Sequence, residues 1–292
     1  MVQKYSPLVS VVLATKNEEE NIENCLRSIK KQTYPDIEII VVDFNSTDKT
    51  RMIARKYTTR IFQLNKVMDL KKTKNFRGAQ INLGVKKSKG TLVFFPDADM
   101  TFDKDLIQES VDLIGKYRYS AVYIPEVIVG NGIFGRIRNF ERSFYNMTCI
   151  DVVRIVKKDI FLRIGGFDEE HIQFGPDDWD FMKKLKKKHP QLTITKNKIY
   201  HHEERLPIKT YLTKKLKYST TFNSYSDKWG KDDQDVKKQL GFYYRFFGVF
   251  TEQGKWKKLL RHPLLTIGMY FLRMLVGLGH LKSFRLYAKI NK

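Results

Sequence analysis

Two aspartates, Asp97 and Asp99, follow a short hydrophobic run in the segment VFFPDADM. A carboxylate at the end of a buried strand needs a partner, because an unpaired buried charge is costly. Basic side chains could supply one, and so could Mg²⁺ or Mn²⁺, since hard cations prefer carboxylate oxygens. These two residues are therefore the first candidates for a site that does chemistry.

The hydrophobic pattern around this segment predicts alternating strands and helices. Predicted strands cover 9–14, 37–42, 60–64 and 91–96. Of three predicted helices between them, the first follows Asn17, the second ends near Tyr57 and the third covers about 78–87. The β-branched runs are typical of strands buried on both faces. This order predicts an α/β fold with a parallel sheet, whose ligands bind beyond the carboxyl ends of the strands.

Polar residues are concentrated at those predicted strand ends: Thr15, Asn17 and Glu18 after the first strand, Asp43 after the second, and Asp97 and Asp99 after the fourth. We expect them to converge on one edge of the sheet. A helix-capping role is enough to explain the presence of Asn17 at this position. Capping and turn roles do not suffice for the two aspartates together.

The second half of the chain changes character near residue 205. Before it, the pattern predicts helices over 103–117, 134–146 and 178–188 and strands over 121–129, 152–156 and 192–200. After it, basic and aromatic segments lead to an apolar stretch at 264–281. Arg273 within that stretch argues against a simple membrane span and favours an interfacial or bundle helix on anionic lipid. Packing on the core as an ordinary helix is the alternative. We therefore predict two domains, 1–205 and 206–292.

The composition is strongly basic, with 54 Lys and Arg against 32 Asp and Glu in 292 residues, a formal charge of +22. Such an excess implies an anionic partner: nucleic acid, an anionic membrane surface or a phosphorylated substrate. Cys25 and Cys149 lack metal-ligand spacing, which favours buried thiols in a reducing compartment. The first residues lack the hydrophobic segment of a secretion signal, so we expect a cytoplasmic protein.

Three segments together resemble family-2 glycosyltransferases with the GT-A fold: VSVVLATKNEEENIENCLRSIKKQTYPDIEIIVVDFNSTDKT, GAQINLGVKKSKGTLVFFPDADM and GGFDEEHIQFGPDDWDF. The resemblance covers about 7–205. A D-x-D motif alone is weak evidence, but three motifs in order are specific. The resemblance implies a GT-A type α/β fold with a mostly parallel central sheet flanked by helices. Here a helical, basic and aromatic C-terminal region follows it.

The resemblance also implies roles for the donor site. Thr15, Asn17 and Glu18 would line the nucleoside pocket, Asp43 would bind the base, Asn82 would lie near the diphosphate or sugar, and Asp97 would contact the ribose or the metal. Asp97, Asp99 and His201 would hold Mg²⁺ or Mn²⁺. Arg77 is a candidate for the diphosphate on charge alone. Phe44 stands where the family often has a second acid, which leaves the base open, and Asn82 could instead be an ordinary helix residue.

In the third segment, the resemblance makes Asp178 the catalytic base of an inverting transfer, because one carboxylate must take the acceptor's proton. Asp177 replaces the more usual Glu, and Pro176 is particular to this chain. A helix cap is the preferred interpretation of Asp177. If the acceptor is a phosphate, Asp178 would only orient it. His202 next to His201 is interpreted as a solvated residue.

The sequence thus predicts a metal-dependent enzyme that moves one sugar from a nucleotide-diphosphate sugar, with a UDP-sugar favoured, to a lipid-linked or polyprenyl-phosphate acceptor. It would work as a peripheral protein at the cytoplasmic face of a membrane. A soluble polysaccharide or protein acceptor is the alternative. The chain lacks Gln-x-x-Arg-Trp, the signature of processive members of the family, so single-sugar transfer is favoured.

Two other classes of function explain part of the sequence. A nucleic-acid-binding protein would explain the charge and the aromatic residues, but not the aspartates at strand ends, which would repel phosphate unless a metal intervened. A catalytically inactive GT-A fold could serve as a binding module. Asp97, Asp99 and Asp178 argue against it, because all three predicted functional carboxylates are present.

Overall fold

The structure, a computed structural model, describes residues 6–290, with side chains for all but Ser219 and residues 280–290. These residues form two compact units. Unit 1 comprises the chain up to Glu126 together with Asp151–His201, and unit 2 comprises Val127–Ile150 together with the chain from His202 onward. These units differ from the predicted domains 1–205 and 206–292 in the segment 127–150, because a segment's own pattern does not reveal which distant segment it packs against.

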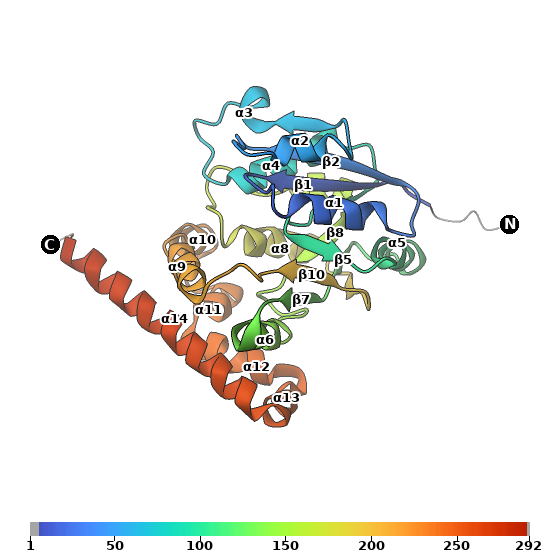
Figure 1. The fold of residues 1–292 in the computed structure, drawn as a ribbon. Helices are drawn as coiled ribbons and strands as arrows, with labels where there is room; N and C mark the ends of the chain where they lie inside the picture. Colours follow the sequence, from blue (N-terminus) through green and yellow to red (C-terminus); the bar gives the residue numbers. More distant parts are fainter. Residues whose placement is uncertain (1–5, 291–292) are drawn as a thin grey trace. The chain divides into compact units, whose positions relative to one another are not determined.

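Unit 1 is built on a seven-stranded sheet of order β3-β2-β1-β4-β8-β6-β9 (Figure 1). Its strands are β1 (Val9–Thr15), β2 (Ile37–Asp43), β3 (Ile61–Gln63), β4 (Leu92–Phe94), β6 (Ala121–Tyr123), β8 (Val153–Lys157) and β9 (Leu192–Ile194). Only β8 runs antiparallel to its neighbours. The predicted mostly parallel sheet is confirmed.

Helices cover both faces of this sheet, as the doubly apolar strands require. They are α1 (Ile22–Lys30), α2 (Thr50–Ala54), α3 (Leu64–Val67), α4 (Phe76–Lys87), α5 (Leu106–Tyr117), α7 (Lys158–Arg163) and α8 (Asp177–Lys188). In β1, Val11 packs in the core with α1 and α5, and Val12 in the core with α4 and α8. Gly84 lets α4 approach the sheet, since a Cβ there would lie 2.2 Å from Val12 Cγ1.

A second, three-stranded sheet of order β5-β10-β7 was not predicted. Its strands are β5 (Met100–Phe102), β10 (Ile199–His202) and β7 (Glu126–Val129). The predicted strands over 121–129 and 192–200 are each divided, with the first part in the large sheet and the second part here. Pro125 interrupts the former, because proline has no N–H for a strand ladder. The antiparallel register of β10 on β5 pairs His201 with Met100, the residue after Asp99.

Unit 2 consists mainly of helices. They are α6 (Gly132–Arg142), α9 (Ile208–Ser219), α10 (Phe222–Trp229), α11 (Gln234–Leu240), a π-helical turn (Tyr244–Gly248), α12 (Val249–Thr251), a 3₁₀ turn (Glu252–Gly254), α13 (Trp256–Arg261) and α14 (Pro263–Ile290). The long helix α14 (Figure 1) packs against α6 and α9. A core of aromatic and aliphatic residues includes Phe144, Phe250 and Met269. Within residues 6–290, no helix is long and apolar enough to cross a membrane.

Candidate active site

The carboxyl ends of β1, β2 and β4 meet at one edge of the large sheet, as predicted for parallel strands. The register pairs Thr15 with Asp43. The chain beyond β4 continues this pairing, because Asp97 forms an isolated parallel bridge with Ala14. Three of the predicted site residues, Thr15, Asp43 and Asp97, are therefore neighbours at the same edge.

Asp43 organises the turn after β2. Its fully buried carboxylate accepts hydrogen bonds from Ser46 N (3.1 Å), from Ser46 Oγ and from Thr15 Oγ1 (3.3 Å). Arg51 Nε lies 3.6 Å from Asp43 Oδ1 and balances the charge. These contacts hold the predicted base-binding edge in one conformation. Contact of Asp43 with a base stays a prediction.

Asn17 and Glu18 tie the loop after β1 to the loop after β2. Asn17 has a left-handed backbone (φ 57°), its Oδ1 accepts from Thr47 N (2.9 Å), and its own N–H donates to Ser46 Oγ (2.9 Å). Glu18 N donates to Thr50 Oγ1 (2.7 Å). The prediction that Asn17 caps a helix was wrong, since α1 begins five residues later at Ile22. The side-chain oxygen of Asn17, which would accept a hydrogen bond in a helix cap, accepts instead from Thr47 in the other loop.

Phe44, which stands where the resemblance led us to look for an acid, stacks on Phe76. Their ring centroids are 4.5 Å apart with an interplanar angle of 9°, and Lys16 Nζ lies 4.7 Å above the Phe44 ring. Cation–π and ring stacking stabilise such an arrangement. The edge beside Asp43 therefore carries a flat aromatic surface instead of a second carboxylate.

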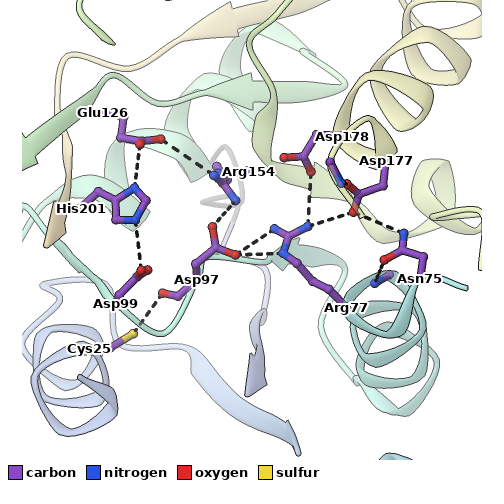
Figure 2. A network of polar contacts seen from close by, with 12 residues as sticks. Cys25, Asn75, Arg77, Asp97, Asp99, Glu126, Arg154, Asp177, Asp178 and His201 are labelled. Carbon is purple, nitrogen blue, oxygen red and sulfur yellow. Dashed lines mark hydrogen bonds and ion pairs between the residues drawn. The ribbon is translucent and has the colours of Figure 1, made fainter. Parts of the chain in front are cut away.

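Arg77 connects the two acidic motifs that the sequence predicted (Figure 2). Its Nε and Nη2 lie 3.0 and 2.9 Å from Asp97 Oδ1. Its Nη1 lies 3.4 Å from Asp178 Oδ1 and 3.5 Å from Asp177 Oδ2. Arg154 Nη1 donates to the other oxygen of Asp97 (3.1 Å). Burial alone would raise the pKa of Asp97, but Arg77 and Arg154, with His201, hold it well below its usual range.

The two adjacent aspartates at the start of α8 differ in environment. Asp177 is buried, and its carboxylate accepts from Gly175 N (2.9 Å) and Asn75 Nδ2 (3.3 Å). Burial, and then the charge of Asp178, raise the pKa of Asp177 to about 6. Asn75 also caps α4 by accepting from Gly78 N (2.9 Å). Asp177 is thus a structural link between two helix starts, whereas the Asp178 side chain remains 27% exposed.

His201 lies between two carboxylates (Figure 2). Its Nε2 is 3.1 Å from Asp99 Oδ2 and its Nδ1 is 2.9 Å from Glu126 Oε1. Burial would lower the pKa of His201, but hydrogen bonds to Asp99 and Glu126 raise it to about 10. His202, by contrast, pairs with Glu204 (3.0 Å). Of the two predicted histidines, His201 is the one that joins the acidic site.

The donor atoms of this site fit a divalent cation in part. Among residues 6–290, no three or more His, Cys, Asp or Glu side chains are grouped so as to hold a metal ion. Both oxygens of Asp97 face arginines. Asp99 Oδ1, however, is buried without a hydrogen-bond partner. Such an atom requires compensation, and a hard cation is a suitable partner for it. Asp99 therefore fits the predicted metal through this oxygen, whereas both nitrogens of His201 are already bonded to carboxylates. His201 and Asp97 stay predicted ligands.

Asn82 has a structural role in the arrangement described. Its Nδ2 donates to Phe167 O (2.8 Å) and Glu169 Oε1 (2.6 Å), and its Oδ1 accepts from Phe167 N (2.9 Å). It thereby anchors the loop after Gly166. This loop lines a cavity of about 440 Å³ that includes Lys86 and Lys184 but none of the predicted metal or catalytic residues. Contact of Asn82 with a diphosphate stays a prediction.

Sequence reasoning missed three residues whose polar side chains join the network, Arg154, Glu126 and Asn75. Arg154 comes from β8, and its carbonyl accepts from Phe95 N (3.1 Å), which places it beside the end of β4. A single charge inside the apolar run VVRIV was a usable signal, because a buried arginine implies an acidic partner. Glu126 and Asn75 lie in loops or at element ends, where the pattern carried no such signal.

Residues 10–168 match the model of glycosyl transferase family 2, more than half of the chain. The chain belongs to glycosyl transferase family 2. Residues 134–205 also match a model described as the N-terminal domain of galactosyltransferase. The resemblance inferred from the three motifs is thereby confirmed.

Curated relatives support this membership. Glycosyltransferase AglE of Haloferax volcanii is 34% identical over 186 residues, which cover 59% of this chain and 60% of AglE. Poly(ribitol-phosphate) beta-N-acetylglucosaminyltransferase TarS of Staphylococcus aureus is 28% identical over 154 residues, 52% of this chain and 26% of TarS. The chain thus matches 60% or less of the length of these relatives.

Solved structures show the same fold. Mannosyltransferase PcManGT from Pyrobaculum calidifontis, in complex with GDP-Man and Mn²⁺, aligns with a TM-score of 0.63 at 19% identity, covering 95% of this chain and 88% of that chain. S. aureus TarS 1-349 aligns with a TM-score of 0.55 at 20% identity, covering 89% and 78%. The predicted GT-A fold is confirmed.

Proposed function

We propose that this protein transfers a single sugar, with inversion, from a nucleotide-diphosphate sugar to an acceptor. The observation that carries the proposal is Arg77, which contacts both Asp97 and Asp178 and so brings the predicted donor and acceptor motifs together. Relatives and structural neighbours named as glycosyltransferases support it, including one solved with GDP-Man and one with UDP-GlcNAc.

The nucleoside of the donor lies at the ends of β1 and β2. Thr15, Asn17 and Glu18 line its pocket, and Asp43 accepts a hydrogen bond from the base. The cross-loop bonds of Asn17 and Glu18 support this assignment, because a preorganised site loses less entropy on binding. A UDP-sugar is the proposed donor.

Asp99 and His201, with Asp97, would hold Mn²⁺ or Mg²⁺, which neutralises the charge that develops on a departing diphosphate. Arg77 and Arg154 add fixed positive charge on either side of Asp97. Such preorganised charges stabilise a leaving group in a partly buried site more than they would in water. These two arginines therefore position and stabilise the diphosphate.

Asp178 acts on the acceptor. The acceptor oxygen bonds to the anomeric carbon while the bond from that carbon to the diphosphate oxygen breaks, and the acceptor's proton passes to Asp178. Exposure supports Asp178 over Asp177, because the side chain of Asp178 is 27% exposed and that of Asp177 only 2%. For a phosphate acceptor, which is already ionised, Asp178 orients the nucleophile instead.

The proposed acceptor is a lipid-linked sugar or polyprenyl phosphate, used by a peripheral protein at the cytoplasmic face of an anionic membrane. The strongly basic and aromatic residues of unit 2 support an amphiphilic, anionic acceptor. A soluble polysaccharide or protein is the alternative acceptor. Product analysis with each acceptor class distinguishes them.

Thermal unfolding with UDP or GDP, with and without Mn²⁺, tests the donor and metal sites. A ligand at about 100 times its Kd stabilises the native state by about 2.7 kcal/mol. We expect one nucleotide to raise the Tm of the native protein only with Mn²⁺, and Asp99→Asn to lose this effect. Asp159→Asn, which alters an exposed ion pair with Arg163, is the matched control and should keep it. If no nucleotide raises the Tm, or if Asp99→Asn responds like the native protein, the proposal is wrong.

A further inference from the structure

Helix α14 exposes a continuous apolar stripe. Its members are Leu264 (81% exposed), Ile267 (67%), Phe271 (57%), Met274 (49%) and Leu278 (54%). Their spacing of three and four residues places all five on one face of the helix. Large apolar side chains gathered on one exposed face indicate a surface that binds something.

The opposite face of α14 is already used by unit 2. Met269 and Leu272 are buried, and Gly268 lies against Ile137 of α6. Arg273 is also buried, and its Nη1 donates to Glu141 Oε1 (2.6 Å) and Tyr145 Oη (3.1 Å). These contacts anchor the helix with a fixed rotation. The exposed stripe is therefore a stable feature of the unit and not an unpacked core face.

Segments that contact α14 have the composition of a membrane interface. Helix α13, which packs against α14, exposes Trp256 and Leu260 together with Lys257 and Arg261. The ring of Phe247 lies 6.3 Å from that of Tyr270 on α14. Aromatic rings and basic side chains are typical of helices that lie in the headgroup region of a bilayer.

The charge of unit 2 decides between a membrane and a second copy of the chain. Val127–Ile150 and His202–Lys292 contain 22 Lys and Arg against 8 Asp and Glu, a formal charge of +14 out of the total of +22. Two such units would repel each other, whereas an anionic lipid surface attracts basic groups. Charge complementarity therefore favours anionic lipid as the occupant of the stripe.

We infer that α14 lies in the surface of an anionic membrane, with Leu264, Ile267, Phe271, Met274 and Leu278 inserted among the lipids. The buried Arg273 pair keeps the opposite face on the protein, so the helix lies along the surface. This inference deepens the proposed function, on which it rests for the lipid-linked acceptor. It identifies the surface of this chain that holds the enzyme where such an acceptor would be found.

Binding to vesicles tests the inserted face. The full chain is sedimented with vesicles of equal parts phosphatidylglycerol and phosphatidylcholine, and with vesicles of phosphatidylcholine alone. We expect binding to the anionic vesicles, and at least about tenfold weaker binding of Ile267→Gln/Phe271→Gln, since two large apolar side chains leave the lipid. Met52→Gln/Val67→Gln changes two similarly exposed side chains of unit 1 and should bind like the native protein.

A second pair of variants separates charge from insertion. Lys257→Gln and Arg261→Gln should each weaken binding about fivefold at low salt and less at high salt, because surface charges are screened. The effect of Ile267→Gln/Phe271→Gln should persist at high salt. Circular dichroism and the Tm of each variant check that the fold is retained.

Three outcomes would overturn the inference: no binding of the native protein to anionic vesicles, equal binding of the α14 and control variants, or a dimer in light scattering that Ile267→Gln/Phe271→Gln disrupts. The nucleotide-dependent Tm shift is measured without vesicles. Failure of the membrane inference therefore leaves that shift intact, and failure of the proposed function leaves vesicle binding intact.

Discussion

Both units bury a charged network around an arginine, but the two networks differ in the sign of their excess charge. In unit 1, Arg77 contacts Asp97, Asp177 and Asp178. In unit 2, Arg138 forms a two-bond pair with Glu203 (3.0 and 3.2 Å) and contacts Glu141 (3.0 Å), which also pairs with Arg273. The local chemistry of the two networks is therefore similar.

The balance of charge separates them. Arg138 and Arg273 contact Glu141 and Glu203 directly, and all four side chains are nearly inaccessible. Lys215 and Arg245 place further positive charge near Glu141, and Arg273 Nε is buried without a hydrogen-bond partner. The unit 1 site has five carboxylates against Arg77, Arg154 and His201, a partly exposed Asp178, and one buried oxygen of Asp99 without a hydrogen-bond partner (Figure 2). A network of buried ion pairs is costly to break, whereas a surplus of carboxylate at an accessible edge suits a cation and a substrate.

The largest expected effect concerns Asp178. Asp178→Asn should lower kcat for sugar transfer by about a thousandfold, the scale of general-base catalysis, while nucleotide binding and the Tm remain near those of the native protein. Single-turnover assays with a hydroxyl acceptor measure this. Asp159→Asn should keep full activity. A variant within tenfold of the native rate would show that Asp178 is not the base.

Replacing one arginine in each network tests the comparison between unit 1 and unit 2 directly. Arg77→Met and Arg273→Met should each lower the free energy of unfolding by about 3 kcal/mol, because each leaves a buried carboxylate with fewer partners. Only Arg77→Met should also weaken nucleotide binding, by tenfold or more. Urea unfolding and nucleotide titration measure the two effects. Loss of nucleotide binding in Arg273→Met would mean that the unit 2 network also supports the donor site.

The unit 2 network also predicts a dependence of stability on pH. Burial would raise the pKa of Glu141, but Arg273 and Arg138 lower it to about 2, from 4.5 in an unfolded chain. Its stabilisation, about 3 kcal/mol, is therefore complete above pH 4.5 and lost as the pH falls toward 2. The difference in unfolding free energy between the native protein and Glu141→Gln should shrink over that range. A difference that does not change with pH would contradict this assignment.

The smallest effect is expected for a pair outside both networks. Arg163 and Asp159 lie four residues apart on α7, with Nη2 to Oδ2 3.0 Å and both side chains more than half exposed. Arg163→Ala should change the free energy of unfolding by about 0.5 kcal/mol or less, because exposed pairs gain little over hydration. Urea unfolding provides the measurement. If Arg163→Ala lowered the free energy of unfolding as much as Arg77→Met, burial would not explain why the ion pairs of the two networks matter more than this exposed pair.

Features with a local pattern were predictable from the sequence. The runs at 9–14 and 37–42 form β1 and β2, and the carboxyl ends of parallel strands meet at one edge whatever lies between them. Thr15, Asp43 and Asp97 could be placed for that reason. Asp178 was placed at a helix start from the acidic residues that open an amphipathic pattern, and α8 begins at Asp177.

Features that depend on long-range pairing were not predictable in this way. The strand β5 has only three residues and no periodicity of its own, and it exists because β10 pairs with it from almost a hundred positions further along the chain. That pairing is also what brings His201 to Asp99. Glu126 and Arg154 reach the same site from a strand start and from an antiparallel strand, and neither position follows from the residues around it.

The sequence by itself determined the family, the class of sheet, the kinds of side chain at its functional edge and the basic character of the C-terminal half. Only the tertiary structure decided which charges neutralise one another, which carboxylate is buried and which is exposed, and which face of α14 remains uncovered. The physical reason is the separation along the chain of the residues that determine each feature. Secondary structure and strand-end chemistry follow from periodicity over a few residues, whereas pairing and burial depend on contacts between segments that are distant in the chain.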